Sequence, residues 1–235
     1  VLQDHAPTVD FSVVESVFKE ELGKLPLDCF AEFNRIPLAA ASLAQVHKAR
    51  TLDGQVVAVK VQYPSLLREF GGDMWTQRVI FFWAGQFFKE FNLSWVHYEL
   101  EWNLRKELDF ANEARNAERC AANFARDPRV YVPHIHWPLT SRRILTMEFI
   151  DGCKITDAAR LKDMKVSLKK AVGVTLEALS DQIFSHGFVH CDPHPGNLFV
   201  RSANNSLGFQ IVILDHGLYR ELREDVRLAY CRLWK

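Results

Sequence analysis

The sequence has no excess of charge of either sign, because its 235 residues include 29 lysines and arginines and 29 aspartates and glutamates. A balanced chain produces no global field that would draw it to nucleic acid or to an anionic membrane surface. No apolar run reaches the roughly 20 residues of a transmembrane helix, and the nearest one, residues 79–88, is followed directly by Lys89 and Glu90. We therefore expect no nucleic-acid partner.

Paired cysteines are missing as well. The five cysteines are an odd number at wide spacings, and no C-x-x-C pair occurs. This pattern indicates reduced thiols in an intracellular compartment rather than a disulfide framework. No repeat or low-complexity tract is present, and a hydrophobic fraction of 48% is typical of a folded globular protein.

The most informative stretch is HCDPHPGN at residues 190–197, followed by Asp215-His216-Gly217 at the end of the apolar run 210–214. The spacing H-x-D-x-x-x-x-N is that of a kinase catalytic loop. It predicts that Asp192 is catalytic and faces a substrate hydroxyl. Asn197 and Asp215 would then bind magnesium, a hard ion that takes few protein oxygens and completes its shell with water and phosphate.

Two other interpretations of this stretch remain open from the residues alone. The first is an ordinary loop with turn residues that binds nothing. The second is a zinc site made by His186, His190, Cys191 and His194, although the set lacks the paired spacings of zinc sites. The order of the two motifs along one chain favours the catalytic interpretation.

Upstream, residues 36–61 predict a β-hairpin in which Asp53-Gly54 forms the turn. The second strand ends in Val-Ala-Val-Lys, and this pattern places Lys60 at the α- and β-phosphates of a nucleotide. Where a protein kinase has a glycine-rich loop, the chain has Ala39, Ala40, Ala41 and Ser42. Alanine restricts the positive φ angles that glycine allows, so a phosphate cover here needs a different backbone path. A small-residue turn without a ligand is the alternative.

Helices are expected over residues 65–125, and they carry the acidic candidates Glu107, Asp109 and Glu113. On one continuous helix Asp109 and Glu113 would share a face, and one of these two carboxylates would pair with Lys60. Farther on, the strand 143–150 resembles a kinase hinge, in which the backbone from Glu148 to Ile150 would meet an adenine edge.

Two more helices are predicted from apolar spacing. The first lies within residues 11–33, has apolar positions from Phe11 to Leu22 and ends around Gly23. The second covers residues 164–186 and ends at Gly187. The side chains of the second helix that we expect to face inward are Val166, Leu168, Val172, Leu176, Leu179 and Ile183.

Taken in order, these motifs resemble the UbiB-like atypical kinases, also called aarF-domain-containing kinases, from about Phe33 to the C-terminus. The resemblance implies a kinase-like fold that binds ATP or ADP with Mg2+, and a mitochondrial protein with a role in lipid or ubiquinone homeostasis. It implies possible lipid or membrane-associated lipid-synthesis partners. Lys60 takes the strand-lysine role with Glu113 as its helix partner, Glu107 and Asp109 match the E-x-D pair, and His190 opens the catalytic motif.

Two departures from that family accompany the resemblance. The K-x-G-Q motif has no match before Ile36, and the chain stops at Lys235, soon after Asp215. We therefore expect a chain that is truncated at both ends.

The fold expected from the sequence is α+β: a protein-kinase-like two-lobed fold with a small N-lobe sheet, extra helices and an incomplete helical C-lobe. The expected ranges are 1–35 for a helical lead-in, 36–150 for the N-lobe and 151–235 for the partial C-lobe. The expected function is an ATP-dependent phosphotransferase or ATPase. The alternatives are a nucleotide-gated scaffold with little catalysis, and a small-molecule kinase of the aminoglycoside or choline type.

Overall fold

The computed structural model describes residues 8–87 and 94–234. The chain divides into two compact units, the first made of Val1–Asn112 and His136–Glu148 and the second of Glu113–Ile135 and Phe149–Lys235. This division differs from the expected ranges at three places. The described residues 8–35 belong to the first unit together with its sheet, and residues 113–135 and 149–150 belong to the second unit.

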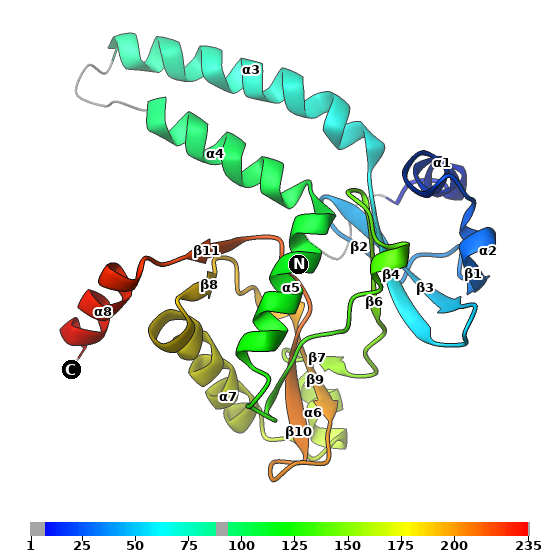
Figure 1. Cartoon of the computed structure of the whole chain (residues 1–235), viewed down its shortest axis with the longest axis vertical. Helices are drawn as coiled ribbons and strands as arrows, with labels where there is room; N and C mark the ends of the chain where they lie inside the picture. The colour runs from blue at the N-terminus through cyan, green and yellow to red at the C-terminus, as the bar shows by residue number, and fades with distance from the viewer. Residues whose placement is uncertain (1–7, 88–93, 235) are drawn as a thin grey trace. The chain divides into compact units, whose positions relative to one another are not determined.

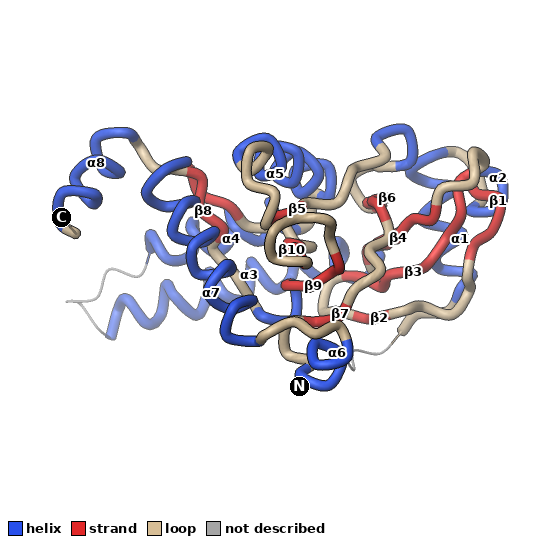
Figure 2. Tube along the Cα trace, turned by 90° about the horizontal axis from the view of Figure 1, so that it is seen from below, coloured by secondary structure: helices blue, strands red, loops and turns tan. Residues whose placement is uncertain are grey.

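The first unit is built on a sheet in the order β1-β3-β4-β6, with β2 paired to β3. Figure 2 draws these strands, like all others, in red. Its strands pair antiparallel, and the predicted hairpin is β3 and β4, joined through Gly54 at φ 89°. Glycine adopts this positive φ without steric cost. The strands are β1 (Phe30–Phe33), β2 (Ala39–Ala40), β3 (Ala44–Thr51), β4 (Val56–Gln62) and β6 (Ile144–Glu148).

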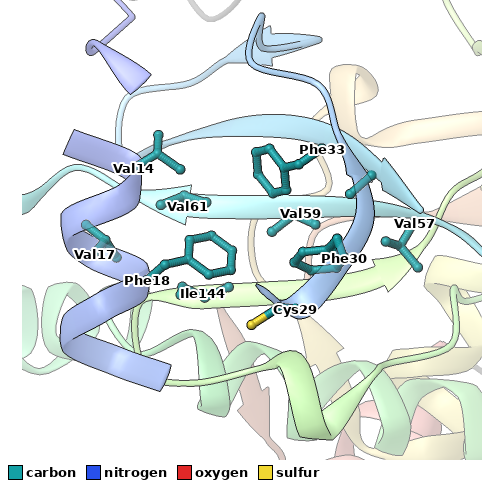
Figure 3. Packing of buried hydrophobic residues seen from close by; sticks show 11 residues of the cluster. Val14, Val17, Phe18, Cys29, Phe30, Phe33, Val57, Val59, Val61 and Ile144 are labelled. Carbon is teal, nitrogen blue, oxygen red and sulfur yellow. The ribbon is translucent and has the colours of Figure 1, made fainter. Parts of the chain in front are cut away.

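The helix α1 (Phe11–Leu22), which the sequence predicts, covers one face of this sheet. Asp10 accepts a hydrogen bond from the Ser12 backbone N–H at 2.9 Å and caps the start, and Gly23 ends the helix in the left-handed conformation at φ 69°. Figure 3 shows the apolar side chains of α1 directed at the strands. The buried set comprises Val14, Val17, Phe18, Cys29, Phe30, Phe33, Ala49, Val57, Val59, Val61 and Ile144.

Long helices follow the sheet, as expected. In Figure 1, α3 (Pro64–Phe87) and α4 (Ser94–Glu107) lie side by side. The chain then leaves the helix at Leu108 and Asp109 before α5 (Phe110–Asn123) begins. The expectation of one helical face shared by Asp109 and Glu113 is therefore wrong. Asp109 instead caps α5, because its Oδ1 accepts a hydrogen bond from the Ala111 N–H at 3.1 Å.

The remaining short elements of the first unit are α2 (Pro26–Cys29) and the 3-10 turn η1 (Trp137–Leu139). Across the described ranges 8–87 and 94–234, none of the helices combines the length and the apolar character that crossing a membrane requires.

The second unit contains a four-stranded sheet in the order β5-β10-β9-β7 and a two-stranded sheet of β8 and β11. The β9–β10 hairpin pairs Leu198 with Ile213, and β5 joins β10 in parallel. The pairing of β5 explains why residues 113–135 belong here. The strands are β5 (Val130–Tyr131), β7 (Cys153–Lys154), β8 (Phe188–His190), β9 (Leu198–Ser202), β10 (Phe209–Ile213) and β11 (Tyr219–Glu221).

Helices complete the second unit. They are α6 (Ala158–Asp163), α7 (Leu168–Asp181) with the π-turn η2 (Gln182–His186), the 3-10 turn η3 (Pro195–Asn197) and α8 (Glu224–Leu233). Gly187 ends η2 at φ 62°, as the sequence predicted.

The predicted inward face of α7 is wrong. Leu168, Val172 and Leu176 are exposed at 47%, 40% and 59%. The buried residues of α7 are instead Ala171, Val174, Thr175 and Ala178. All four are small or β-branched, and a helix face with short side chains can pack closely on its neighbours.

Candidate functional site

The catalytic-loop motif lies in the second unit and begins at His190, the last residue of β8 (Phe188–His190). The backbone N–H of Asp192 donates to His190 Nδ1 at 3.1 Å, and the Asp192 carbonyl accepts a hydrogen bond from the His194 N–H at 2.7 Å. Pro195 then opens η3, which ends at Asn197. The loop is thus held by its own backbone bonds and by proline, while the Asp192 side chain is exposed.

His190 acts as an internal support for this loop. It is 5% exposed, and its backbone N–H donates to Gln182 Oε1 at 2.8 Å. Burial lowers the pKa of His190, opposed by the nearby charges of Asp215 and Asp192 and by a hydrogen bond to the Asp215 backbone. Because Nδ1 accepts a hydrogen bond, the neutral ring carries its proton on Nε2.

Asp215 follows β10 and is brought to the catalytic loop by backbone hydrogen bonds. The Leu214 N–H donates to the Asn197 carbonyl at 3.0 Å, and the Cys191 N–H donates to the Leu218 carbonyl at 3.0 Å. Asp215 Oδ1 accepts a hydrogen bond from the Gly217 N–H at 2.9 Å. The first and the last of these hydrogen bonds involve the metal candidates Asn197 and Asp215, and both candidates are half-buried.

The donor chemistry of this arrangement fits magnesium. A carboxylate and an amide oxygen are hard ligands, and two protein groups suffice where phosphate and water complete an octahedron. Within the residues that the structure describes, no three His, Cys, Asp or Glu side chains are grouped so that they could hold a metal ion. The alternative of zinc bound by His186, His190, Cys191 and His194 therefore has no support.

The first unit carries the predicted nucleotide lysine. Lys60 lies on β4 between Val46 of β3 and Leu145 of β6, and its Nζ is 4.8 Å from the centroid of the Phe110 ring. A cation over an aromatic face is favourable and holds the ammonium in place. The predicted strand lysine is thus on a central strand of a sheet.

The alanine-rich segment forms a tight hairpin rather than a helical turn. Ala39 and Ala40 make β2, and the Ala41 N–H donates to the Ala44 carbonyl at 2.8 Å. Ala40 is buried, Ala41 is half-buried, and Ala39 and Ser42 are exposed. The segment therefore takes its own backbone path, as expected for a loop without glycine. Contact of these residues with a phosphate stays a prediction.

The other predicted residues are distributed between the units. Glu107 ends α4, and Glu148 ends β6, after which the chain enters the second unit. Glu113 is 2% exposed and Ile150 is 8% exposed, and both belong to the second unit. The structure brings together His190, Asp192, Asn197 and Asp215. The pairing of Lys60 with a carboxylate and the adenine contact of residues 148–150 stay predictions.

Sequence reasoning missed the residues that support this site from behind. Gln182 holds the His190 backbone, Asn116 Nδ2 donates to the His216 carbonyl at 2.9 Å, and the Tyr219 hydroxyl lies 3.0 Å from His216 Nδ1. Asn116 precedes His216 by 100 positions, so no local spacing could have joined them. Tyr219 stands two residues after the Asp-His-Gly motif, which was the only available signal.

Comparison with known proteins agrees with this geometry. Residues 1–235 match the family described as the ABC1 atypical kinase-like domain. The chain is 48% identical over 236 residues to "Probable serine/threonine-protein kinase abkD" of Dictyostelium discoideum, with 100% of this chain and 34% of that protein covered. It is 43% identical over 235 residues to AarF domain-containing protein kinase 1 of Mus musculus, with 100% of this chain and 45% of that protein covered.

A solved structure is similar as well. The complex of Rv3197 with erythromycin from Mycobacterium tuberculosis aligns with a TM-score of 0.76 at 29% identity, over 92% of this chain and 53% of that one. The predicted resemblance to aarF-domain kinases and the predicted α+β kinase-like fold are confirmed. The chain spans less than half the length of the curated relatives named above, and it belongs to the ABC1 atypical kinase-like family.

Proposed function

We propose that the protein binds a magnesium–nucleotide complex, ATP or ADP, and acts as a phosphotransferase or ATPase. The observation that carries this proposal is the joining of two motifs by the Leu214–Asn197 and Cys191–Leu218 backbone hydrogen bonds, each 3.0 Å long. Those bonds fix a potential base, Asp192, and two oxygen ligands within one unit. The family and the naming of relatives as protein kinases support the same reaction class.

Catalysis by this site would rest on positioning. Asn197 and Asp215 would hold magnesium, which neutralises phosphate charge when bound with a nucleotide. Exposed Asp192 would accept a hydrogen bond from the attacking hydroxyl or water and orient its oxygen, and Lys60 would contribute positive charge to the phosphates.

The test is thermal unfolding of the purified chain with ATP or ADP, with and without magnesium, beside Asp215→Asn. We expect a magnesium-dependent rise in Tm that Asp215→Asn abolishes. The matched control is Asp163→Asn, which makes the same charge change at an exposed residue of α6 and should retain the rise. Absence of any magnesium-dependent rise in a folded sample would contradict the proposal.

Turnover separates an enzyme from a scaffold. Asp192→Ala and Lys60→Ala should each lower nucleotide turnover by about 100-fold or more, while far-UV circular dichroism stays unchanged. Equal turnover in wild type and both variants would disprove these roles. Tight nucleotide binding without phosphate release under any lipid condition would favour the scaffold function.

The biological setting follows only from the resemblance to UbiB-like kinases. We infer from it a mitochondrial protein that supports lipid or ubiquinone homeostasis and has lipid-synthesis proteins as partners. Fractionation of cells that express the full-length protein would test the location. Recovery outside mitochondria would remove this part of the proposal and leave the nucleotide chemistry untouched.

A further inference from the structure

The residue after the metal-ligand candidate Asp215 is buried histidine, and it is held on three sides. His216 is 2% exposed; its Nε2 lies 3.1 Å from the Ile213 carbonyl, and its Nδ1 lies 3.0 Å from the Tyr219 hydroxyl. Because Nε2 faces a carbonyl, it carries the proton, and Nδ1 accepts from Tyr219. The His216 carbonyl accepts a hydrogen bond from Asn116 Nδ2 at 2.9 Å. Both the side chain and the backbone next to Asp215 are therefore fixed.

Tyr219 connects this histidine to the catalytic-loop strand. The residue is 5% exposed, it lies opposite His190 in the β8–β11 pair, and its ring stacks on Phe188 with a centroid distance of 4.4 Å. Its hydroxyl also lies 3.5 Å from Cys120 Sγ. A buried hydroxyl with these neighbours keeps one orientation, because leaving it unpaired would cost free energy.

Residues on one face of α5 contact the segment 216–221. Asn116, Arg119 and Cys120 are three and four positions apart, so they share a face of the helix. Asn116 contacts His216, Arg119 contacts Glu221, and Cys120 contacts Tyr219. The Arg119 Nη2 atom lies 2.7 Å from Glu221 Oε1. The ion pair is about half exposed, at 45% and 67%, and contributes little. The part-buried hydrogen bond of Asn116 and the buried contacts of Tyr219 carry the restraint.

We propose that Asn116 and Tyr219 are positioning residues that hold the segment 216–221 in one conformation and so aim the Asp215 carboxylate at the metal. The inference rests on the proposed magnesium–nucleotide function. The Gly217 N–H donates a hydrogen bond to Asp215 Oδ1. The orientation of the Asp215 carboxylate therefore depends on the backbone at Gly217, which Asn116 and Tyr219 restrain. Loss of an outer hydrogen bond to a metal-ligand segment typically weakens metal affinity about tenfold or more.

The first test measures the magnesium concentration that half-saturates ATP binding in wild type, Tyr219→Phe and Asn116→Ala. We expect it to rise about tenfold in both variants, while ATP affinity without magnesium stays at the wild-type value. Tyr230→Phe makes the same chemical change at a 46% exposed ring of α8 and should behave as wild type. An unchanged magnesium requirement in Tyr219→Phe and Asn116→Ala would overturn the inference.

A second measurement is independent of any ligand. Hydrogen–deuterium exchange of the free protein should be faster across residues 216–221 in Tyr219→Phe than in Tyr230→Phe, with α1 exchanging equally in both. Equal exchange across 216–221 would overturn the inference even where wild type binds magnesium and ATP. Faster exchange in a protein that binds neither would keep the restraint and reject the proposed function, so the two failures are distinguishable.

Discussion

At the scale of single residues, the environment rather than the residue type assigns each role. Asp192 is exposed and available to a substrate, whereas His190, two positions earlier, is buried and supports the Asp192 backbone. The motif alone names both residues but does not separate these tasks. Two predictions belong to this scale, one from the space around a glycine and one from a buried histidine.

Gly152 lies where no side chain fits. A Cβ at this position would stand 2.6 Å from the Val200 carbonyl oxygen on β9, closer than packed atoms approach. We expect Gly152→Ala to lower the free energy of unfolding by about 1–3 kcal/mol, measured by urea denaturation. Gly173→Ala is the control, because a Cβ there meets nothing within 4 Å and the residue lies inside α7. That variant should gain about 0.5–1 kcal/mol, and a loss as large as that of Gly152→Ala would contradict the argument.

His47 predicts a dependence of stability on pH. Burial lowers its pKa in the folded chain, although a hydrogen bond to the Asn34 carbonyl opposes the shift. The unfolded chain therefore binds the proton more readily, and stability falls as pH drops below about 6.5 toward the folded pKa. His47→Gln should flatten this slope in denaturation measured between pH 7 and 5. His134→Gln, at an exposed position, is the control, and an equal slope in His47→Gln and wild type would refute the prediction.

At the scale of elements, α1 contributes to the core of the first unit together with the strands. Arg143, just before β6, forms ion pairs with two glutamates of α1: its Nε lies 2.7 Å from Glu21 Oε1, and its Nη2 lies 2.6 Å from Glu20 Oε2. Apolar contacts act in the same place, since the Phe18 ring meets Phe30 and Phe33 at centroid distances of 6.0 and 5.7 Å. What the sequence indicated as a lead-in is therefore part of the sheet's core.

Phe18 is the clearest measure of that packing, because none of it is exposed. We expect Phe18→Ala to lower the free energy of unfolding by about 3–5 kcal/mol through lost burial and the cavity left behind. Leu27→Ala, at a side chain that is 57% exposed, should change it by less than about 1 kcal/mol. Similar losses in the two variants, measured by guanidinium denaturation, would mean that α1 does not pack as described.

At the scale of the whole molecule, the chain crosses between its two compact units three times: inside α5, between Ile135 and His136, and after Glu148. Lys60 belongs to the first unit and Asp192, Asn197 and Asp215 belong to the second. Nucleotide binding to the folded chain should be visible as stabilisation against unfolding.

A quantitative form of that expectation follows from linkage. At a magnesium–ATP concentration 100 times its Kd, the free energy of unfolding should rise by about 2.7 kcal/mol, and by about 4.1 kcal/mol at 1,000 times. The Kd comes from an independent titration, and EDTA in excess of magnesium should remove the increase. A rise that stops growing well below these values would indicate that ATP also binds the unfolded chain.

The sequence by itself determined the features that depend on neighbouring residues. The β3–β4 hairpin with its Asp-Gly turn, the helix ending at Gly23, Lys60 on its strand and the order of the two site motifs all follow from local spacing and backbone preference. Tertiary structure decided what depends on distant partners. These features are the buried face of α7, the break at Asp109 before α5, and the hold of Asn116 on His216. Periodicity shows that a helix has an apolar face, but burial is set by the surfaces that the rest of the chain offers, and no local pattern contains them.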